Sequence, residues 1–93
     1  MPRTMGELDT LAGAQQFIEA HGGKLSGSRA RGDWTDDSDW DYWLSLRVIR
    51  TVLKPALVDQ GVQWESPMTG AITWYPEGIQ VEVSDLFPKR QPY

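Results

Sequence analysis

Apolar residues recur at three- and four-residue intervals near the start of the chain. The residues in this row are Leu8, Leu11, Ala14, Phe17 and Ile18. A helix would carry all of them on one face, so the spacing predicts a helix over roughly 5–21. Thr4 and Glu7 form a Thr-x-x-Glu capping box at its start, and Gly22 and Gly23 end it.

Short extended segments and a second helix follow. Lys24–Ser26 is predicted to form a brief strand, and a short helix is expected to begin over 29–31. A second strand is predicted over 39–46, where the sequence turns apolar. Residues 47–60 have the periodicity of a helix, and because Pro55 lacks an amide hydrogen, we expect a kink there or a later start.

The clearest hairpin lies near the end of the chain. Ala71–Tyr75 is rich in strand-forming residues, and Ile79–Ser84 alternates apolar and polar positions. The sequence Pro-Glu-Gly at 76–78 provides the turn between them. Residues 89–93 are expected to form a loose tail.

Composition narrows the class of protein. The chain has 93 residues and is expected to form one domain over 1–93. It has no cysteine, which excludes disulfides and thiolate metal sites. No apolar run reaches about 18 residues, so the sequence indicates neither export nor a membrane span, and a cytoplasmic location is expected. The net charge of −4 disfavours nonspecific nucleic-acid binding, which needs clustered Lys and Arg.

The candidate chemistry lies between the first two predicted strands. Asp39 and Asp41 are two apart in a strand, so both carboxylates are expected on the same face. Two like charges so close repel each other, and a hard divalent cation such as Mg²⁺ is the usual remedy. The turn at Gly27 and Ser28 adds backbone amides that suit phosphate oxygens. The sequence thus combines a phosphate cradle with a metal-binding acid pair.

The same residues carry a resemblance to a known family. Gly27-Ser28, ten residues and then Asp39-Trp40-Asp41 match the Gly-Ser, ten residues, Asp-x-Asp signature of the polymerase-β-like nucleotidyltransferase superfamily. Among its members the chain most closely resembles the minimal nucleotidyltransferases of the antitoxin type. Two features depart from the family's pattern, because Ser26 is polar and Trp40 is bulkier than the usual aliphatic residue between the acids.

The resemblance implies a fold, cofactors and residue roles. The fold would be α+β, with a small, mixed and strongly twisted sheet flanked by helices. ATP would be the donor, and Asp39 and Asp41 would bind Mg²⁺ or Mn²⁺. Ser28, together with Gly27, would contact the terminal phosphates. Arg29 and Arg31 are candidates for neutralising the triphosphate.

The family also has a third carboxylate on a later strand, between apolar residues. Val81-Glu82-Val83 matches that context, and Asp85 is the competing candidate. Strand alternation favours Glu82, because it places Glu82 on the face opposite Val81 and Val83. Glu82 would then be the third metal ligand, and it would assist deprotonation of the acceptor.

The resemblance therefore implies an enzyme that transfers a nucleoside monophosphate, most simply AMP from ATP, to a hydroxyl group with release of pyrophosphate. By analogy the acceptor would be a tyrosine of a HEPN-type partner toxin, and self-association could shape the acceptor side. The alternative is an inactive nucleotide-binding or protein-interaction module that acts by binding a partner through its tryptophan-rich surface. Transfer to RNA ends is disfavoured because the chain lacks a basic platform. Trp34, Trp64 and Trp74 are expected to be structural.

Overall fold

The computed structural model describes residues 7–35 and 39–86. The elements in chain order are α1 (Leu11–Ala20), β1 (Lys24–Ser26), α2 (Gly27–Arg31), β2 (Trp40–Trp43), α3 (Leu46–Val48), η1 (Ile49–Leu53), α4 (Lys54–Asp59), β3 (Ala71–Trp74), η2 (Pro76–Gly78) and β4 (Val81–Ser84). Across the part of the chain that is described, no helix combines the length and the apolar character needed to cross a membrane. The expected tail at 89–93 lies outside the described residues.

The strands form a four-stranded mixed sheet in the order β1-β2-β4-β3. β1 and β2 are antiparallel, β2 and β4 are parallel, and β3 and β4 are antiparallel. The predictions of an α+β class and of a mixed sheet with helices beside it are confirmed. The parallel pairing of β2 with β4 joins segments that are far apart in the sequence, and it brings the two predicted acidic strands together.

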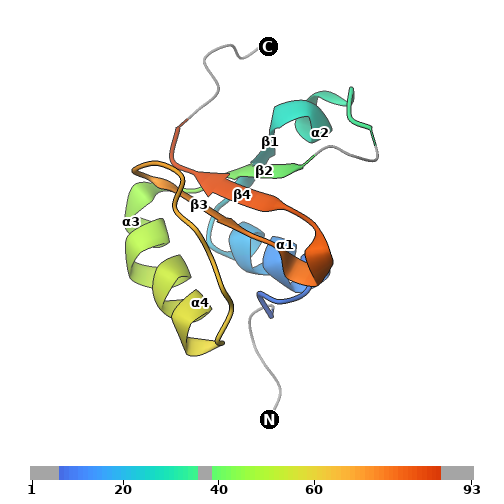
Figure 1. The fold of residues 1–93 in the computed structure, drawn as a ribbon. Coiled ribbons are helices and arrows are strands. Elements are labelled where there is room, and N and C mark those ends of the chain that lie inside the picture. The colour runs from blue at the N-terminus through green and yellow to red at the C-terminus, as the bar shows by residue number, and fades with distance from the viewer. Residues whose placement is uncertain (1–6, 36–38, 87–93) are drawn as a thin grey trace.

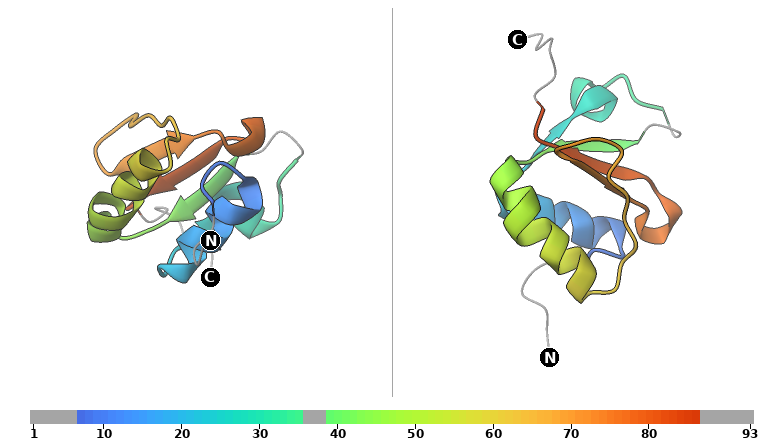
Figure 2. Two further views of the ribbon diagram at one scale, coloured as in Figure 1. Left: turned by 90° about the horizontal axis from the view of Figure 1, so that it is seen from below. Right: turned by 60° about the vertical axis from the view of Figure 1, so that its left-hand side comes forward.

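The helices α1 and α3–α4 both pack against one face of the sheet (Figures 1 and 2). The core lies between them and that face. Its largest fully buried side chains include Leu8, Ile18, Leu44, Ile49, Leu53, Leu57, Ile72, Trp74, Val81 and Val83. On the other face, the described elements include only α2, which lies at the β1 edge (Figure 1).

The first helix begins later than the sequence predicts. It starts at Leu11 rather than near residue 5, and Thr10 is its N-cap, accepting a hydrogen bond from the Gly13 amide at 3.0 Å. Leu8 belongs to the core but precedes the helix, because its carbonyl accepts a bond from Trp74 and its amide donates to Gln60. The predicted capping box is therefore wrong for this helix; Thr4 lies outside the described residues.

The second helical region runs without a break from Leu46 to Asp59 but changes its winding. Ser45, expected to be part of a strand, instead caps it by accepting a bond from the Val48 amide, so β2 ends at Trp43. Residues 49–53 form a π-helical turn, closed by the Lys54 amide on the Ile49 carbonyl. Pro55 follows at once and has no amide hydrogen to donate to an α-helical ladder. The wider turn is how this helix accommodates the proline.

The terminal hairpin is confirmed. β3 and β4 pair with Thr73 opposite Glu82, and the turn at Pro76–Gly78 is a 3₁₀ turn. β4 begins at Val81, two residues later than predicted. The segment before β3 also pairs with it, because Glu65 and Thr73 exchange backbone hydrogen bonds of 2.8 Å.

Candidate functional site

One polar row crosses all four strands on the face that lies away from α1 and α4. In the register of the sheet, Ser26 is opposite Asp41, Asp41 is opposite Glu82, and Glu82 is opposite Thr73. Residues paired in this way point to the same face. The adjacent row, which includes Tyr42 and Val83, is buried against the helices. The alternation thus separates an acidic row from the core.

Gly27 connects this row to α2. It follows β1 directly and has φ +73°, a left-handed conformation that side-chain-bearing residues rarely adopt. A Cβ placed on Gly27 would lie 2.5 Å from Oδ2 of Asp41. The turn backbone therefore lies directly against the Asp41 carboxylate. This juxtaposition requires glycine for both its conformation and its lack of a side chain.

The carboxylates of the site interact electrostatically. Burial raises the pKa of Asp41 above its ordinary value, the negative charge of Asp39 raises it further, and the positive charge of Arg31 opposes the shift. The pKa of Glu82 is also raised, first by burial and then by the charges of Asp41 and Asp39. Asp39 itself is exposed, immediately before β2. The three carboxylates thus form one group of mutually repelling charges.

The donor set is suited to a hard cation but is not a closed cage. Within residues 7–35 and 39–86, no group of three or more acidic or histidine side chains is arranged to hold a metal ion. Two features nonetheless fit Mg²⁺. The available ligands are carboxylate oxygens, and their mutual repulsion would be relieved by a cation. Mg²⁺ is usually held by one or two carboxylates, with water and substrate phosphate completing its shell.

A pocket of about 280 Å³ opens over this row. Ser26, Gly27, Asp41 and Glu82 line it at the level of the paired strands, and Leu86 borders it after β4. Ser26 was not among the predicted site residues, and in the sequence it differs from the family's pattern only by being polar. Its register opposite Asp41 is what brings it into the pocket, and strand pairing across the Gly27 turn is the signal that could have identified it.

The two candidates for the third carboxylate lie in different places. Glu82 is the direct neighbour of Asp41 across the parallel strands. The Asp85 carboxylate lies against Gly70, where an added Cβ would be 2.5 Å from Oδ1. The Asp85 amide also donates to the Gly70 carbonyl at 3.0 Å. Asp85 therefore contacts the chain just before β3, at the open end of the hairpin, whereas Glu82 belongs to the acidic row.

The residues predicted to contact or neutralise the phosphates all lie in α2, and they include Ser28, Arg29 and Arg31. The Arg29 guanidinium stacks on Trp40 and Trp34, with its central carbon 4.0 and 4.6 Å from the ring centroids. Arg31 forms an exposed ion pair of 3.4 Å with Asp33, and its charge also reaches Asp41. Ser28 belongs to α2, but its side chain lies outside the described part of the structure.

The tryptophans differ in role. Trp74 is fully buried, and its Nε1 donates to the Leu8 carbonyl at 2.7 Å, so its predicted structural role is confirmed. Trp64 is half-buried, with the Lys54 ammonium 5.4 Å from its ring centroid. Trp34 is 48% exposed and contacts Arg29. Trp34 is thus a surface residue of the α2 region rather than part of the core.

Comparison of the chain with protein-family models, with curated proteins and with solved structures finds no match. The residues and geometry of the acidic row, and the Gly-Ser, ten residues, Asp-x-Asp spacing, are therefore what indicate a function.

Proposed function

We propose that this protein is a nucleotidyltransferase of the polymerase-β-like type. It would transfer a nucleoside monophosphate, AMP from ATP in the simplest case, to a hydroxyl acceptor. The observation that carries the proposal is the contact of the Gly27 turn with Asp41, which is itself paired with Glu82. A glycine-lined backbone and paired carboxylates on one uncovered sheet face are what a nucleoside triphosphate with its cation would require.

Asp41 and Glu82 would hold Mg²⁺ or Mn²⁺, and the exposed Asp39 would add negative charge beside them. When bound, the cation would neutralise the triphosphate and stabilise charge on the phosphoryl oxygens. Gly27 lets the chain backbone approach the phosphates, since no side chain intervenes. The positive charge of Arg31 already acts on Asp41 and would add to the attraction for the donor.

The raised pKa of Glu82 suits a proton acceptor. In the proposed reaction the acceptor hydroxyl loses its proton to a carboxylate of this row as its oxygen attacks the α-phosphorus of ATP. The bond between the α- and β-phosphates breaks, and pyrophosphate leaves. Water on the open face would compete with the acceptor, so a bound partner is expected to cover it.

The acceptor side would be supplied by another protein. By analogy with minimal nucleotidyltransferase antitoxins, that protein would be a HEPN-type toxin modified on a tyrosine, in the cytoplasm where ATP is available. A second copy of the chain, as a homo-oligomer, could cover the same face.

The test is transfer of label from ATP labelled at the α- or the γ-phosphate, with Mg²⁺ or Mn²⁺ and with the protein alone or with a HEPN-type toxin. The proposal expects transfer of the α-label only, reduced at least ~100-fold in Asp41→Asn and Glu82→Gln. Glu65→Gln removes an exposed carboxylate outside the row and should leave transfer unchanged. Transfer of the γ-label, or equal transfer by Asp41→Asn, would contradict the proposal.

The alternative is a module that binds a nucleotide or a partner without turnover. It is favoured by one observation, that the described residues contain no ready-made group of three metal-binding side chains. This alternative expects the double variant Asp39→Ala/Asp41→Ala to retain the full biological effect of the protein. Loss of that effect together with label transfer would exclude it.

A further inference from the structure

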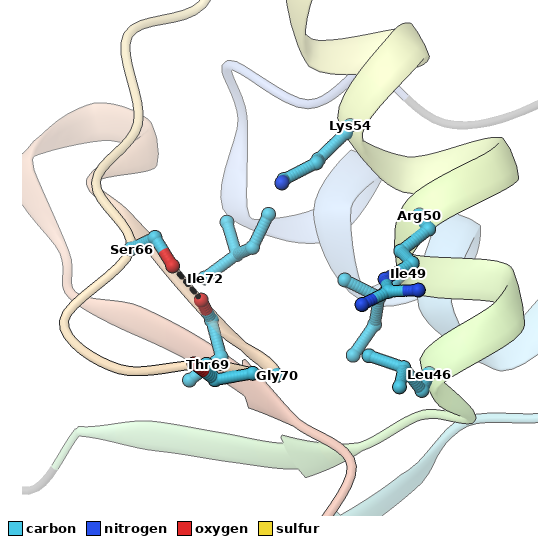
Figure 3. A pocket seen from close by; sticks show the side chains of 9 residues that line it. Leu46, Ile49, Arg50, Lys54, Ser66, Thr69, Gly70 and Ile72 are labelled. Atoms are coloured by element: carbon cyan, nitrogen blue, oxygen red, sulfur yellow. Dashed lines mark hydrogen bonds between the residues drawn. The ribbon is translucent and has the colours of Figure 1, made fainter.

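A second polar cavity lies on the helix-covered side of the molecule, away from the acidic row. It has a volume of about 220 Å³ and lies between the α3–η1 helix and the loop that leads into β3 (Figure 3). Leu46, Ile49 and Ile72 are its apolar lining, and Arg50 and Lys54 extend into it from the helix (Figure 3). Ile72 points to the core face of β3, so this cavity and the acidic row lie on opposite faces of the sheet.

Positive charge gathers at this cavity without a compensating acid. None of its lining residues is Asp or Glu. Within the described ranges, the ion pair is that of Arg31 with Asp33, and neither Arg50 nor Lys54 has a carboxylate partner. Like charges four residues apart on a helix repel each other. An anion placed between these two cations would therefore be attracted by both of them.

A π-helical turn forms one wall of the cavity, and a loop held by a side-chain hydrogen bond forms the other. Arg50 lies inside the π-helical turn that ends just before Lys54. Such turns are frequent at functional sites, although Pro55 already accounts for the widening here. On the opposite wall, the Ser66 hydroxyl donates to the Ala71 carbonyl at 2.9 Å and so holds the loop in place (Figure 3). Thr69 lies on the same wall and can offer a hydroxyl to a ligand.

The same two cations also border an apolar groove. Pro55, Val58 and Trp64 form its apolar lining, Asp59 adds one carboxylate after Val58, and its volume is about 500 Å³. Val58 is 67% exposed, which is high for a large aliphatic side chain. The groove and the cavity therefore meet at Arg50 and Lys54, with apolar surface on one side and a polar recess on the other.

We propose that this surface binds a small phosphate monoester that carries a flat aromatic or apolar group. The phosphate would lie between the Arg50 guanidinium and the Lys54 ammonium, with Thr69 as a further donor. The apolar group would lie on Trp64, Pro55 and Val58. The two cations determine where the phosphate of the ligand binds, and the apolar groove determines where its aromatic or apolar group binds. The proposal is independent of nucleotidyl transfer, because it uses the opposite face of the sheet.

The experiment is an NMR titration with phenyl phosphate in the absence of divalent cations. It follows the Trp64 indole N–H, assigned with Trp64→Phe, and the Ile72 methyl groups. The proposal expects saturable shifts with a Kd of about 1 mM or tighter. It also expects at least tenfold weaker binding by Arg50→Gln and Lys54→Gln. Arg47→Gln removes the same charge from the same helix outside the cavity, and it should bind like the unmodified protein.

Two further ligands, AMP and inorganic phosphate, show which class of phosphate compound binds and whether the apolar groove contributes to binding. AMP that binds as tightly as phenyl phosphate supports a nucleotide among the ligands, whereas inorganic phosphate that does so would overturn the role of the apolar groove. Asp41→Asn should bind phenyl phosphate as the unmodified protein does. The result of this titration is therefore independent of whether the protein is a nucleotidyltransferase. The proposal is overturned if no saturable shift occurs, or if Arg47→Gln weakens binding as much as Arg50→Gln.

Discussion

Gly27 lies so close to Asp41 that a Cβ on the glycine would be 2.5 Å from the carboxylate oxygen Oδ2. Gly32, at the other end of α2, has a similar positive φ of +89° but open space where its Cβ would be. The two glycines therefore have the same conformational requirement and differ in what surrounds them. This difference allows the role of the Gly27 turn to be separated from its backbone strain.

Gly27→Ala and Gly32→Ala form the first test. Each should lower the free energy of unfolding by about 1–2 kcal/mol, because alanine is strained at positive φ. Only Gly27→Ala should also displace the Asp41 carboxylate and so abolish metal-dependent ATP binding. Thermal unfolding and an ATP titration of both variants are the measurements. Equal ATP binding by the two variants would show that the contact with Asp41 is irrelevant to the site.

Glu82→Gln should stabilise the metal-free protein at pH 7. The substitution removes a negative charge directly opposite Asp41, and cross-strand pairs contribute roughly 0.2–1 kcal/mol. The pKa values of Asp41 and Glu82 are raised in the native state. The native protein therefore binds protons at these two groups more tightly than the unfolded chain does. The stability contributed by these groups is therefore lost as the pH rises from about 4 through the native pKa values.

Denaturant unfolding between pH 4 and pH 8 measures this effect. Glu82→Gln should be more stable than the unmodified protein at pH 7. The difference in unfolding free energy should disappear at pH 4, where the raised pKa of Glu82 keeps it protonated in the native state. Glu65→Gln makes the same change of charge at an exposed position outside the acidic row. A Glu82→Gln variant that is less stable than the unmodified protein at pH 7 would refute the mutual repulsion.

Divalent cations should reverse that order of stability. A ligand at ten times its dissociation constant stabilises the native state by about 1.4 kcal/mol. Mg²⁺ or Mn²⁺ should therefore raise the Tm of the unmodified protein, because the cation relieves the repulsion between Asp41 and Glu82. The rise should be absent in Asp41→Asn/Glu82→Gln. The same rise in that double variant would assign the cation to another place.

Trp74→Phe tests the core contact that holds the segment before α1. The substitution removes the 2.7 Å bond to the Leu8 carbonyl and leaves a small void at a fully buried position. The expected loss is about 2–3 kcal/mol of unfolding free energy. Trp34→Phe changes the same side chain at a position that is 48% exposed, and it should cost much less. Similar losses for both would refute the structural role of Trp74.

The sequence predicted well wherever the pattern was local. The hairpin of β3 and β4 follows from alternation on either side of Pro-Glu-Gly, and the helix of Phe17 and Ile18 follows from their spacing. The start of α1 was missed because Leu8 has helical spacing but is held by hydrogen bonds to Trp74 and Gln60. Contacts across 66 and 52 positions leave no local signal in a single sequence.

The candidate site was predictable in part for the same reason. Asp39 and Asp41 are close in sequence, and the Val-Glu-Val context together with strand alternation favoured Glu82 over Asp85. The parallel pairing of Asp41 with Glu82 joins two strands that are far apart in the chain, so no local pattern could predict it. Ser26 enters the row only through its register with β2. The cavity at Arg50 likewise depends on a loop that meets the helix from a distant part of the chain.

Titration of ATP into the protein, followed by calorimetry with and without Mg²⁺, tests the central claim most directly, because it requires no knowledge of the acceptor. The account predicts saturable binding that needs the cation, is lost in Asp41→Asn and is kept in Glu65→Gln. Because AMP-type ligands could also bind at Arg50 and Lys54, the titration is repeated in Arg50→Gln, which should retain cation-dependent binding. ATP binding that is absent, or that is the same in Asp41→Asn as in the unmodified protein, would contradict the account.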